Sequence, residues 1–220
     1  MDTRLLLVSH ASTAAMRAGR FPADDPLDAR GLAEASAARA RLSIPDVVAV
    51  FVSPAVCARE TASALGLVAT VHKGLADRDY GRWHGRRLAD LAVEAPQDLA
   101  AWTHDPDAAA PDGESFSQLV KRVGQWLDAM SEEISRLTGD AALSDAMGGA
   151  MDAAPSKATS GAPRNRRDVV TVTHAPVIRA AIVHALGASP AVFPRIEVAP
   201  LSVVELRCAR RGWTWWPATQ

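Results

Sequence analysis

The chain has 220 residues, a length that suits a single domain spanning residues 1–220 with a sizeable core. Its 24 lysines and arginines nearly balance its 25 aspartates and glutamates, which argues against a nucleic-acid or membrane-surface partner. Cys57 and Cys208 form no CxxC pattern, the N-terminal apolar run is too short for a signal peptide, and no run approaches the roughly 20 apolar residues of a membrane span. We therefore expect a cytoplasmic protein that binds neither nucleic acid nor membrane.

The first predicted element is a short buried strand that ends abruptly in polar residues. Leu5 to Val8 are apolar without interruption, and Ser9-His10 follow, directly before an Ala-rich, helix-compatible segment at residues 11–19. In an open α/β sheet, ligands bind at the carboxyl ends of strands, where the next helix also presents free N–H groups. The pattern places His10 where an imidazole can act on an anion.

Helices and strands alternate through the first half of the chain. In order, the sequence predicts a helix at 28–42, a strand at 47–52, a helix at 55–65, a strand near 68–72 and a charged, Gly-punctuated loop at 75–85. The strand at 47–52 is apolar throughout, as central strands buried on both faces are, and it ends in Ser53-Pro54.

The second half contains the clearest helix and one irregular segment. The predicted elements are helices at 88–94, 96–102 and 116–137, a strand at 169–173, a helix at 175–186, and strands at 202–208 and 213–216. Residues 139–167 are rich in Ala, Gly, Ser, Pro and Met, and we interpret them as a flexible low-complexity insertion. Strands alternating with helices predict a three-layer α/β sandwich with a mostly parallel central sheet.

Three of the predicted strands end alike, each in a polar residue next to a helix: His10, Ser53 and His174. Parallel strands bring their carboxyl ends to one edge, so two imidazoles and a hydroxyl are expected in one pocket. One imidazole can act as a nucleophile near neutral pH, and the second can stabilise charge on a transferring group. Phosphoryl transfer needs mainly such positioning and compensation of oxygen charge.

Five segments carry the motifs of the chain: Ser9-His10-Ala11-Ser12-Thr13, 53–62, 75–85, Gly113-Glu114-Ser115 and Thr173-His174-Ala175. In order and spacing they resemble the signatures of the histidine phosphatase superfamily, in its phosphoglycerate mutase-like branch. Those signatures read Arg-His-Gly-x-Thr, Ser-x-x-x-Arg-Ala-x-x-Thr-Ala, Leu-x-Glu-x-x-x-Gly-x-x-x-Gly, Gly-Glu-Ser and Thr-His-Gly. The resemblance covers nearly the whole chain and implies a phosphoglycerate mutase-like fold.

The resemblance also implies roles for individual residues. His10 would be the nucleophile that becomes phosphohistidine, His174 would donate a hydrogen bond to phosphate oxygens, and Asp77 would protonate the leaving oxygen. The implied partner is a small phosphorylated metabolite, with no metal and no cofactor. Further substrate-binding positions implied in the same way are Ser9, Thr13, Ser53, Cys57 and Ala175.

The chain departs from the family pattern at two positions. The phosphate-clamping arginines of the family fall at Ser9 and Cys57, so both bidentate guanidinium groups are expected to be missing. Losing one such donor typically costs about 3–4 kcal/mol of transition-state stabilisation. The candidate replacements are Arg17, Arg20 and Arg78, which lie on loops expected to border the pocket. We interpret Cys57 as a small replacement for the arginine rather than as a reactive thiol.

The favoured prediction is a metal-independent phosphomonoesterase acting through phospho-His10. A second hypothesis is a phosphate-ligand binder or regulatory protein that has kept the fold and lost turnover. A third is a metallohydrolase built on the same His and Asp residues. A phosphoglycerate mutase is less favoured, because Ser12 replaces the acidic or amide residue common there in mutases. Substrate identity and oligomeric state stay open, with a homodimer as one option.

Overall fold

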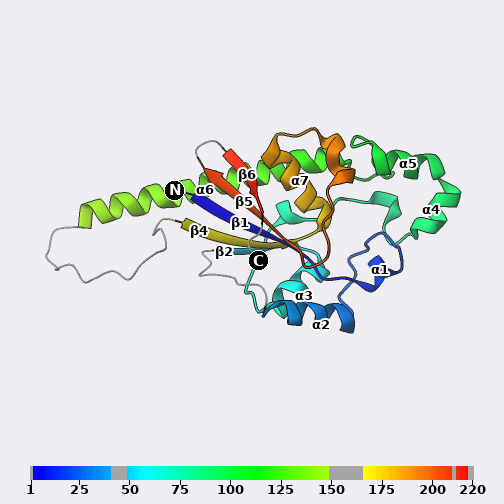
Figure 1. The fold of residues 1–220 in the computed structure, drawn as a ribbon, viewed down its shortest axis with the longest axis horizontal. Coiled ribbons are helices and arrows are strands. Elements are labelled where there is room, and N and C mark those ends of the chain that lie inside the picture. The colour runs from blue at the N-terminus through cyan, green and yellow to red at the C-terminus, as the bar shows by residue number, and fades with distance from the viewer. Residues whose placement is uncertain (1, 41–48, 149–165, 210–211, 218–220) are drawn as a thin grey trace.

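The computed structural model describes residues 2–40, 49–148, 166–209 and 212–217. Within these ranges a six-stranded sheet has the strand order β3-β2-β4-β1-β5-β6 (Figure 1). The strands are β1 (Asp2–Ser9), β2 (Ala49–Val52), β3 (Thr70–Val71), β4 (Arg166–Thr173), β5 (Val203–Ala209) and β6 (Gly212–Trp216). Strands β1 to β4 pair in parallel, whereas β5 is antiparallel to β1 and β6 is antiparallel to β5.

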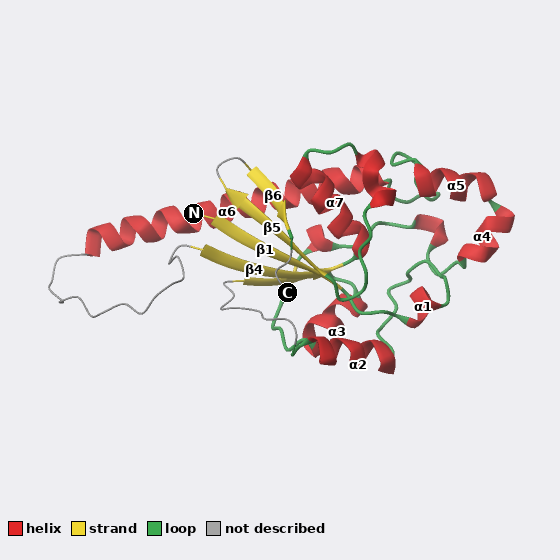
Figure 2. Cartoon of the chain, viewed as in Figure 1, coloured by secondary structure: helices red, strands yellow, loops and turns green. Residues whose placement is uncertain are grey.

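Helices cover both faces of this sheet. They are α1 (Ala14–Arg17), α2 (Ala29–Ala38), α3 (Val56–Ala64), α4 (Leu88–Glu94), α5 (Pro96–His104), α6 (Phe116–Gly148) and α7 (Ala175–Leu186), with short 3-10 turns at Lys73–Leu75, Gly81–Trp83 and Pro190–Arg195. Figure 2 shows α6 and α7 on one side of the sheet and α2 and α3 on the other, with α1, α4 and α5 beyond the ends at which β1 and β4 finish. The predicted three-layer α/β sandwich with a mostly parallel sheet is confirmed.

Strand β1 shows why its sequence is apolar without alternation. Leu5 and Leu7 are fully buried in the cluster formed with α6 and α7, whereas Leu6 and Val8 belong to the cluster formed with α2 and α3. Successive side chains of a strand point to opposite faces, so a strand covered by helices on both faces needs apolar residues at every position.

A smaller cluster lies apart from the sheet and supports the loops beyond the strand ends. Its buried members are Phe21, Tyr80, Trp83, Leu91 and Ala110. They join the loop after α1, the loop after β3, helix α4 and the loop between α5 and α6. The charged loop predicted at residues 75–85 is therefore anchored through its aromatic residues.

The predicted insertion at 139–167 is corrected in part. Helix α6 continues to Gly148 and β4 begins at Arg166, so both ends of that segment are regular structure. The reason is the high helix propensity of Ala, Leu and Met in residues 139–148, which a search for apolar periodicity does not register. Residues 149–165 and the predicted end of the helix at 28–42 lie outside the described residues. None of the described helices is both long and apolar enough to cross a membrane.

The close approach of two loops at Gly81 leads to a prediction about stability. Gly81 has a positive φ of 46°, and a Cβ there would lie 2.1 Å from the Pro111 carbonyl oxygen. Gly19 also has a positive φ, of 61°, but a Cβ would meet nothing within 4 Å. Both alanine variants incur the left-handed backbone cost of about 1–2 kcal/mol, and Gly81→Ala must in addition push the loops apart. We expect urea denaturation to show Gly81→Ala less stable than Gly19→Ala by about 1–3 kcal/mol; equal losses would contradict this packing.

Candidate active site

The candidate site forms where β2, β4 and β1 end side by side. The His10 amide donates to the Thr173 carbonyl at 2.9 Å, and the Ser53 amide donates to the Val172 carbonyl at 2.9 Å. These bonds extend the parallel ladder by one residue on each side of β4. His10, Ser53 and His174 therefore lie next to one another at one edge of the sheet, with the two imidazole centroids 5.0 Å apart.

His10 is held as a neutral imidazole with one defined tautomer. Its Nδ1 lies 2.7 Å from the Ala11 carbonyl oxygen. Because a carbonyl only accepts, Nδ1 carries the hydrogen and Nε2 keeps its lone pair. Burial lowers the pKa of His10 to about 4, and the neighbouring His174 adds to this shift. At neutral pH the Nε2 lone pair is consequently free to attack an electrophile.

A buried threonine fixes the backbone of the His10 turn. The Ala11 amide donates to Thr61 Oγ1 at 3.0 Å, and the Thr61 hydroxyl donates to the Cys57 carbonyl at 2.7 Å. Thr61 is fully buried on α3. Its single hydroxyl ties the turn after β1 to the first turn of α3, and so sets the position of His10 relative to Cys57.

His174 makes one polar contact on each side of its ring. Its Nε2 lies 2.8 Å from Ser53 Oγ, and its Nδ1 lies 3.4 Å from a carboxylate oxygen of Asp77. Burial lowers the pKa of His174 to about 4, so this ring is also neutral near pH 7. The contacts hold it between the end of β2 and the loop after β3.

Asp77 is the acid nearest to the two histidines. Burial raises its pKa to about 6, against the opposing effect of the hydrogen bond that it accepts from the Arg78 amide at 2.8 Å. A desolvated carboxyl group of this kind keeps its proton at a higher pH than an exposed aspartate does. It is therefore suited to general acid catalysis at weakly acidic pH.

The loop that carries Asp77 is positioned from α6. Arg122 donates to the carbonyl oxygens of Gly74, Ala76 and Asp77 at 3.1–3.2 Å. Its guanidinium is also bound by both carboxylate oxygens of Glu114 at 2.9 Å. Glu114 was predicted only as part of the Gly-Glu-Ser motif, and Arg122 was not predicted as a site residue. No local pattern marks an arginine of a long amphipathic helix as the anchor of a distant loop.

A cavity of about 450 Å³ opens at these residues. The predicted site residues that line it are His10, Thr13, Arg20, Cys57, Asp77, Arg78, His174 and Ala175. Three others do not line it. Ser53 lies behind His174, Ser9 is buried in the sheet beside Leu201 and Ser202, and the Arg17 guanidinium forms an ion pair with Asp28.

Among the described residues that line the cavity, acids outnumber arginines. The carboxylates are those of Asp24, Asp25, Asp77 and Asp79, and the guanidinium groups are those of Arg20 and Arg78. The excess of acids was not predicted, because Asp24 and Asp25 were interpreted only as loop residues. Asp24 accepts a hydrogen bond from the Val56 amide at 2.8 Å, so a carboxylate already occupies the N-terminus of α3.

The two cavity arginines differ in how they are engaged. Arg78 is buried; its Nε donates to the Glu114 carbonyl at 2.7 Å and one terminal nitrogen donates to the Ala108 carbonyl at 2.8 Å. Its guanidinium also packs 4.9 Å from the centroid of the Trp102 ring. Arg20, in contrast, has an exposed side chain. Of the three arginines predicted as phosphate ligands, Arg20 is therefore the one best placed to reach a bound anion.

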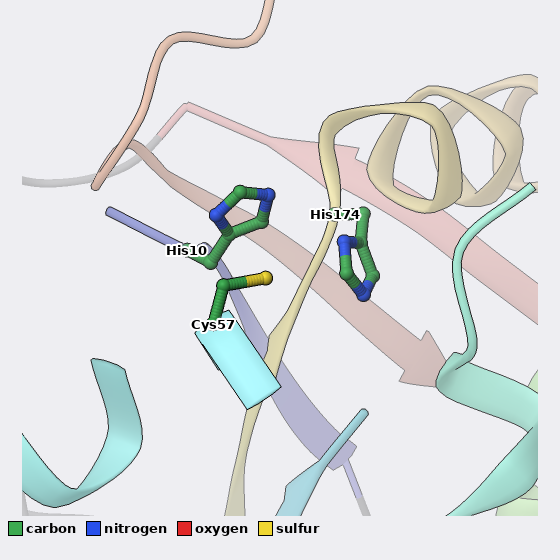
Figure 3. Close-up of side chains that lie close together, drawn as sticks. All are labelled: His10, Cys57 and His174. Atoms are coloured by element: carbon green, nitrogen blue, oxygen red, sulfur yellow. The ribbon is translucent and has the colours of Figure 1, made fainter. Parts of the chain in front are cut away.

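Cys57 lies beside both histidines. Burial, aided by the charge of Asp77, raises the pKa of its thiol to about 12, which fits an unreactive thiol when no ligand is bound. Figure 3 shows the Cys57 side chain projecting from α3 toward the space between the His10 and His174 rings. One ligand atom from each of the three residues lies within 4.8 Å of the others, a grouping that can hold a metal ion.

Comparison with known proteins identifies related families and folds. A model of the histidine phosphatase superfamily (branch 1) matches residues 5–144 and 149–216. The chain is 32% identical over 133 residues to a bifunctional protein of Mycobacterium tuberculosis. These aligned residues make up 57% of this chain and 36% of that protein. The aligned part thus spans little more than a third of the length of that relative.

Solved structures of phosphatases share the fold over nearly the whole chain. A mycobacterial glucosyl-3-phosphoglycerate phosphatase complexed with VO3 is 23% identical, with 96% of each chain covered and a TM-score of 0.75. An α-ribazole phosphatase from Shigella flexneri is 21% identical, with 97% of this chain and 94% of that chain covered and a TM-score of 0.73. At these identities the likeness establishes the fold.

The buried hydroxyl of Thr61 should stabilise the fold more than an exposed threonine hydroxyl does, because it holds the turn after β1. In Thr61→Val the Ala11 amide loses its acceptor inside the protein, and we expect a loss of about 1–3 kcal/mol in the free energy of unfolding. Thr103→Val is the matched control, since its exposed hydroxyl only donates to the Leu99 carbonyl; a change within about 0.5 kcal/mol is expected there. Chemical denaturation measures both, and equal effects would show that the Thr61 bond does not hold the turn.

Proposed function

Because this chain belongs to the histidine phosphatase superfamily (branch 1), we propose that it hydrolyses a small phosphate monoester by way of a phosphohistidine on His10. The observation that carries this proposal is the meeting of His10, His174 and Asp77 in one cavity. The two imidazoles are neutral near pH 7, and the Asp77 carboxyl group, with its pKa raised to about 6, can donate a proton at weakly acidic pH. The phosphatases among the solved structures support phosphatase chemistry in general, and the finer assignments rest on this chain's own residues.

In the proposed first step, His10 Nε2 attacks the phosphorus atom and the ester P–O bond breaks. The leaving oxygen takes the carboxyl proton of Asp77, so the alcohol departs neutral. The neutral imidazole is competent for attack because its Nδ1–H stays bonded to the Ala11 carbonyl. Transfer of the phosphoryl group to nitrogen gives a phosphohistidine whose developing charge that carbonyl helps to stabilise.

In the second step, water hydrolyses the phosphohistidine. The Asp77 carboxylate takes a proton from the attacking water, the P–N bond breaks, and His10 returns to its neutral form as phosphate leaves. The single N–H of the neutral His174 ring is the donor proposed for the phosphate oxygens. Bound phosphate replaces one of the two contacts of the ring, with Ser53 or with Asp77, and the other contact holds the ring in place.

The charge around the cavity predicts weak binding of a phosphate dianion and slow turnover. Four carboxylates line the cavity against two guanidinium groups, one of which is engaged by backbone carbonyls. Ser9 and Cys57, which stand where the family pattern has phosphate-clamping arginines, favour a second candidate function, a phosphate-ligand binder without turnover. For either function the proposed ligand is a small phosphorylated metabolite, because a cavity of about 450 Å³ suits molecules of that size.

The nucleophile assignment is tested with His10→Ala. We expect hydrolysis of p-nitrophenyl phosphate to fall by at least about 10³-fold, because the variant lacks the imidazole that forms the covalent intermediate. His104→Ala, at an exposed histidine outside the cavity, serves as the control and should keep the wild-type rate. Acid-labile label from a ³²P-phosphate ester should appear on the wild type and on His104→Ala, but not on His10→Ala. Stabilisation by phosphate without label or turnover would favour the binder.

The role of Asp77 is tested by varying the leaving group. Asp77→Asn removes the proton donor, so it should lower kcat/KM for phenyl phosphate by about 10²–10⁴-fold and that for p-nitrophenyl phosphate much less, because kcat/KM reports formation of the phosphohistidine and not its hydrolysis. With phenyl phosphate, the wild-type kcat/KM should fall as pH rises through about 6, because the carboxyl then loses the proton that it must donate. A similar loss on both substrates would assign proton donation to another group.

A further inference from the structure

The phosphoryl-transfer mechanism leaves Cys57 without a role. The thiol is nevertheless buried beside the two histidines that are most important to the site, with residue exposures of 9% for His10, 7% for Cys57 and 3% for His174. The three side chains come from three different elements: the turn after β1, the first turn of α3 and the turn after β4. Their convergence depends on the tertiary fold, not on any local motif.

We propose that His10, Cys57 and His174 form a binding site for a thiophilic divalent metal ion, Zn²⁺. Two imidazole nitrogens and one thiolate sulfur are ligands that this ion favours, and a set of three protein ligands leaves a fourth position open. The proposal goes beyond the proposed phosphatase function and does not rest on it.

The spacing of the three ligand atoms fits such a site. Zn–N bonds of about 2.0–2.1 Å and Zn–S bonds of about 2.3 Å place tetrahedral ligand atoms roughly 3.3–3.7 Å apart. The ligand atoms here all lie within 4.8 Å of one another. Closing around an ion therefore requires movements of at most roughly 1.5 Å for bonds of this length, which small side-chain rotations supply.

Both histidines already have the outer contacts that metal-bound imidazoles use. Such rings commonly donate their second N–H to a carbonyl, carboxylate or water, which fixes the ligating nitrogen. His10 donates Nδ1–H to the Ala11 carbonyl and leaves Nε2 for the ion. His174 contacts Ser53 through one nitrogen and Asp77 through the other, so the ion replaces one contact and the second stays as the outer bond.

The electrostatics of the cavity favour a cation. Asp24, Asp25, Asp77 and Asp79 line the same cavity as the three ligand residues, and Asp77 lies close enough to His174 to offer an oxygen at the fourth position. Binding forms two Zn–N bonds to neutral rings and one Zn–S bond. The Cys57 thiol proton passes to solvent, because a coordinated thiol is deprotonated.

The proposal has a consequence for phosphoryl transfer. An ion bound at His10 Nε2 occupies the lone pair that would attack phosphorus. Zn²⁺ and phosphoryl transfer are therefore mutually exclusive at this site, and added Zn²⁺ is expected to inhibit any phosphatase activity until a chelator removes it.

Cobalt substitution provides the direct test. Chelator-treated wild-type protein titrated with Co²⁺ should bind one ion per chain, with a thiolate-to-cobalt charge-transfer band in the near ultraviolet and visible bands typical of tetrahedral Co²⁺. Zn²⁺ should abolish both signals by displacement. Cys57→Ser should lose the charge-transfer band and bind Zn²⁺ more than about 100-fold more weakly, because an inner ligand matters at least as much as an outer one.

Two further variants test whether the ion is bound by Cys57 and His174. Cys208→Ser, at the second free cysteine, should keep the wild-type band and affinity. Ser53→Ala should keep the band but lower Zn²⁺ affinity by about 10–100-fold, because it removes only the outer contact of His174. Circular dichroism and thermal melting establish that each variant is folded, and Cys57→Ala replaces Cys57→Ser if that variant is not.

The outcomes separate this proposal from the phosphatase proposal. Absence of the charge-transfer band in the wild type, or its loss in Cys208→Ser but not in Cys57→Ser, would overturn the metal site whatever the phosphatase assays show. A Cys57-dependent band in a protein without turnover would support the metal site and count against the phosphatase function. Turnover that is insensitive to Zn²⁺ in a protein that shows the band would overturn the predicted exclusion.

Discussion

The arrangement of the site depends on β4 lying between β2 and β1 in a parallel sheet. From that position the carbonyls of Val172 and Thr173 accept the amides of Ser53 and His10, one on each side. These bonds bring three turns that are more than 40 residues apart in sequence to one place. The Ser53–His174 contact and the closeness of the two imidazoles follow from it.

Burial then determines the chemistry of the side chains that meet there. Both histidines are kept neutral, Asp77 keeps its proton to about pH 6, and the Cys57 thiol stays protonated. Neutral imidazoles suit two different uses, since a free lone pair can attack phosphorus or bind a metal ion. The carboxylates around the cavity favour the cation, whereas the family and the placement of Asp77 favour the phosphoryl group.

Contacts outside the sheet complete the site around the histidines. The Glu114–Arg122 pair fixes the Asp77 loop, Arg78 is engaged by two carbonyls, and Asp24 occupies the N-terminus of α3. None of these contacts belongs to the sheet, and each changes the charge or shape that a ligand meets. A fold shared with several phosphatases is therefore compatible with different ligands, because the sheet places the histidines and the loops decide the surrounding charge.

The sequence by itself determined the order of strands and helices along the chain. It also predicted that His10, Ser53 and His174 meet at one edge of the sheet. It could do so because apolar runs, polar strand ends and parallel connectivity are local patterns with one common outcome at the sheet edge. Only the tertiary structure decided that Arg17 is paired with Asp28, that Arg78 is buried against carbonyls and that Cys57 faces both imidazoles. A side chain on a loop or a helix end has no fixed direction until its partners are in place, and those partners lie on other elements. The sequence thus identified His10 as the nucleophile candidate. The charge that surrounds His10 became clear only from the packed loops, because the charged side chains lie on those loops.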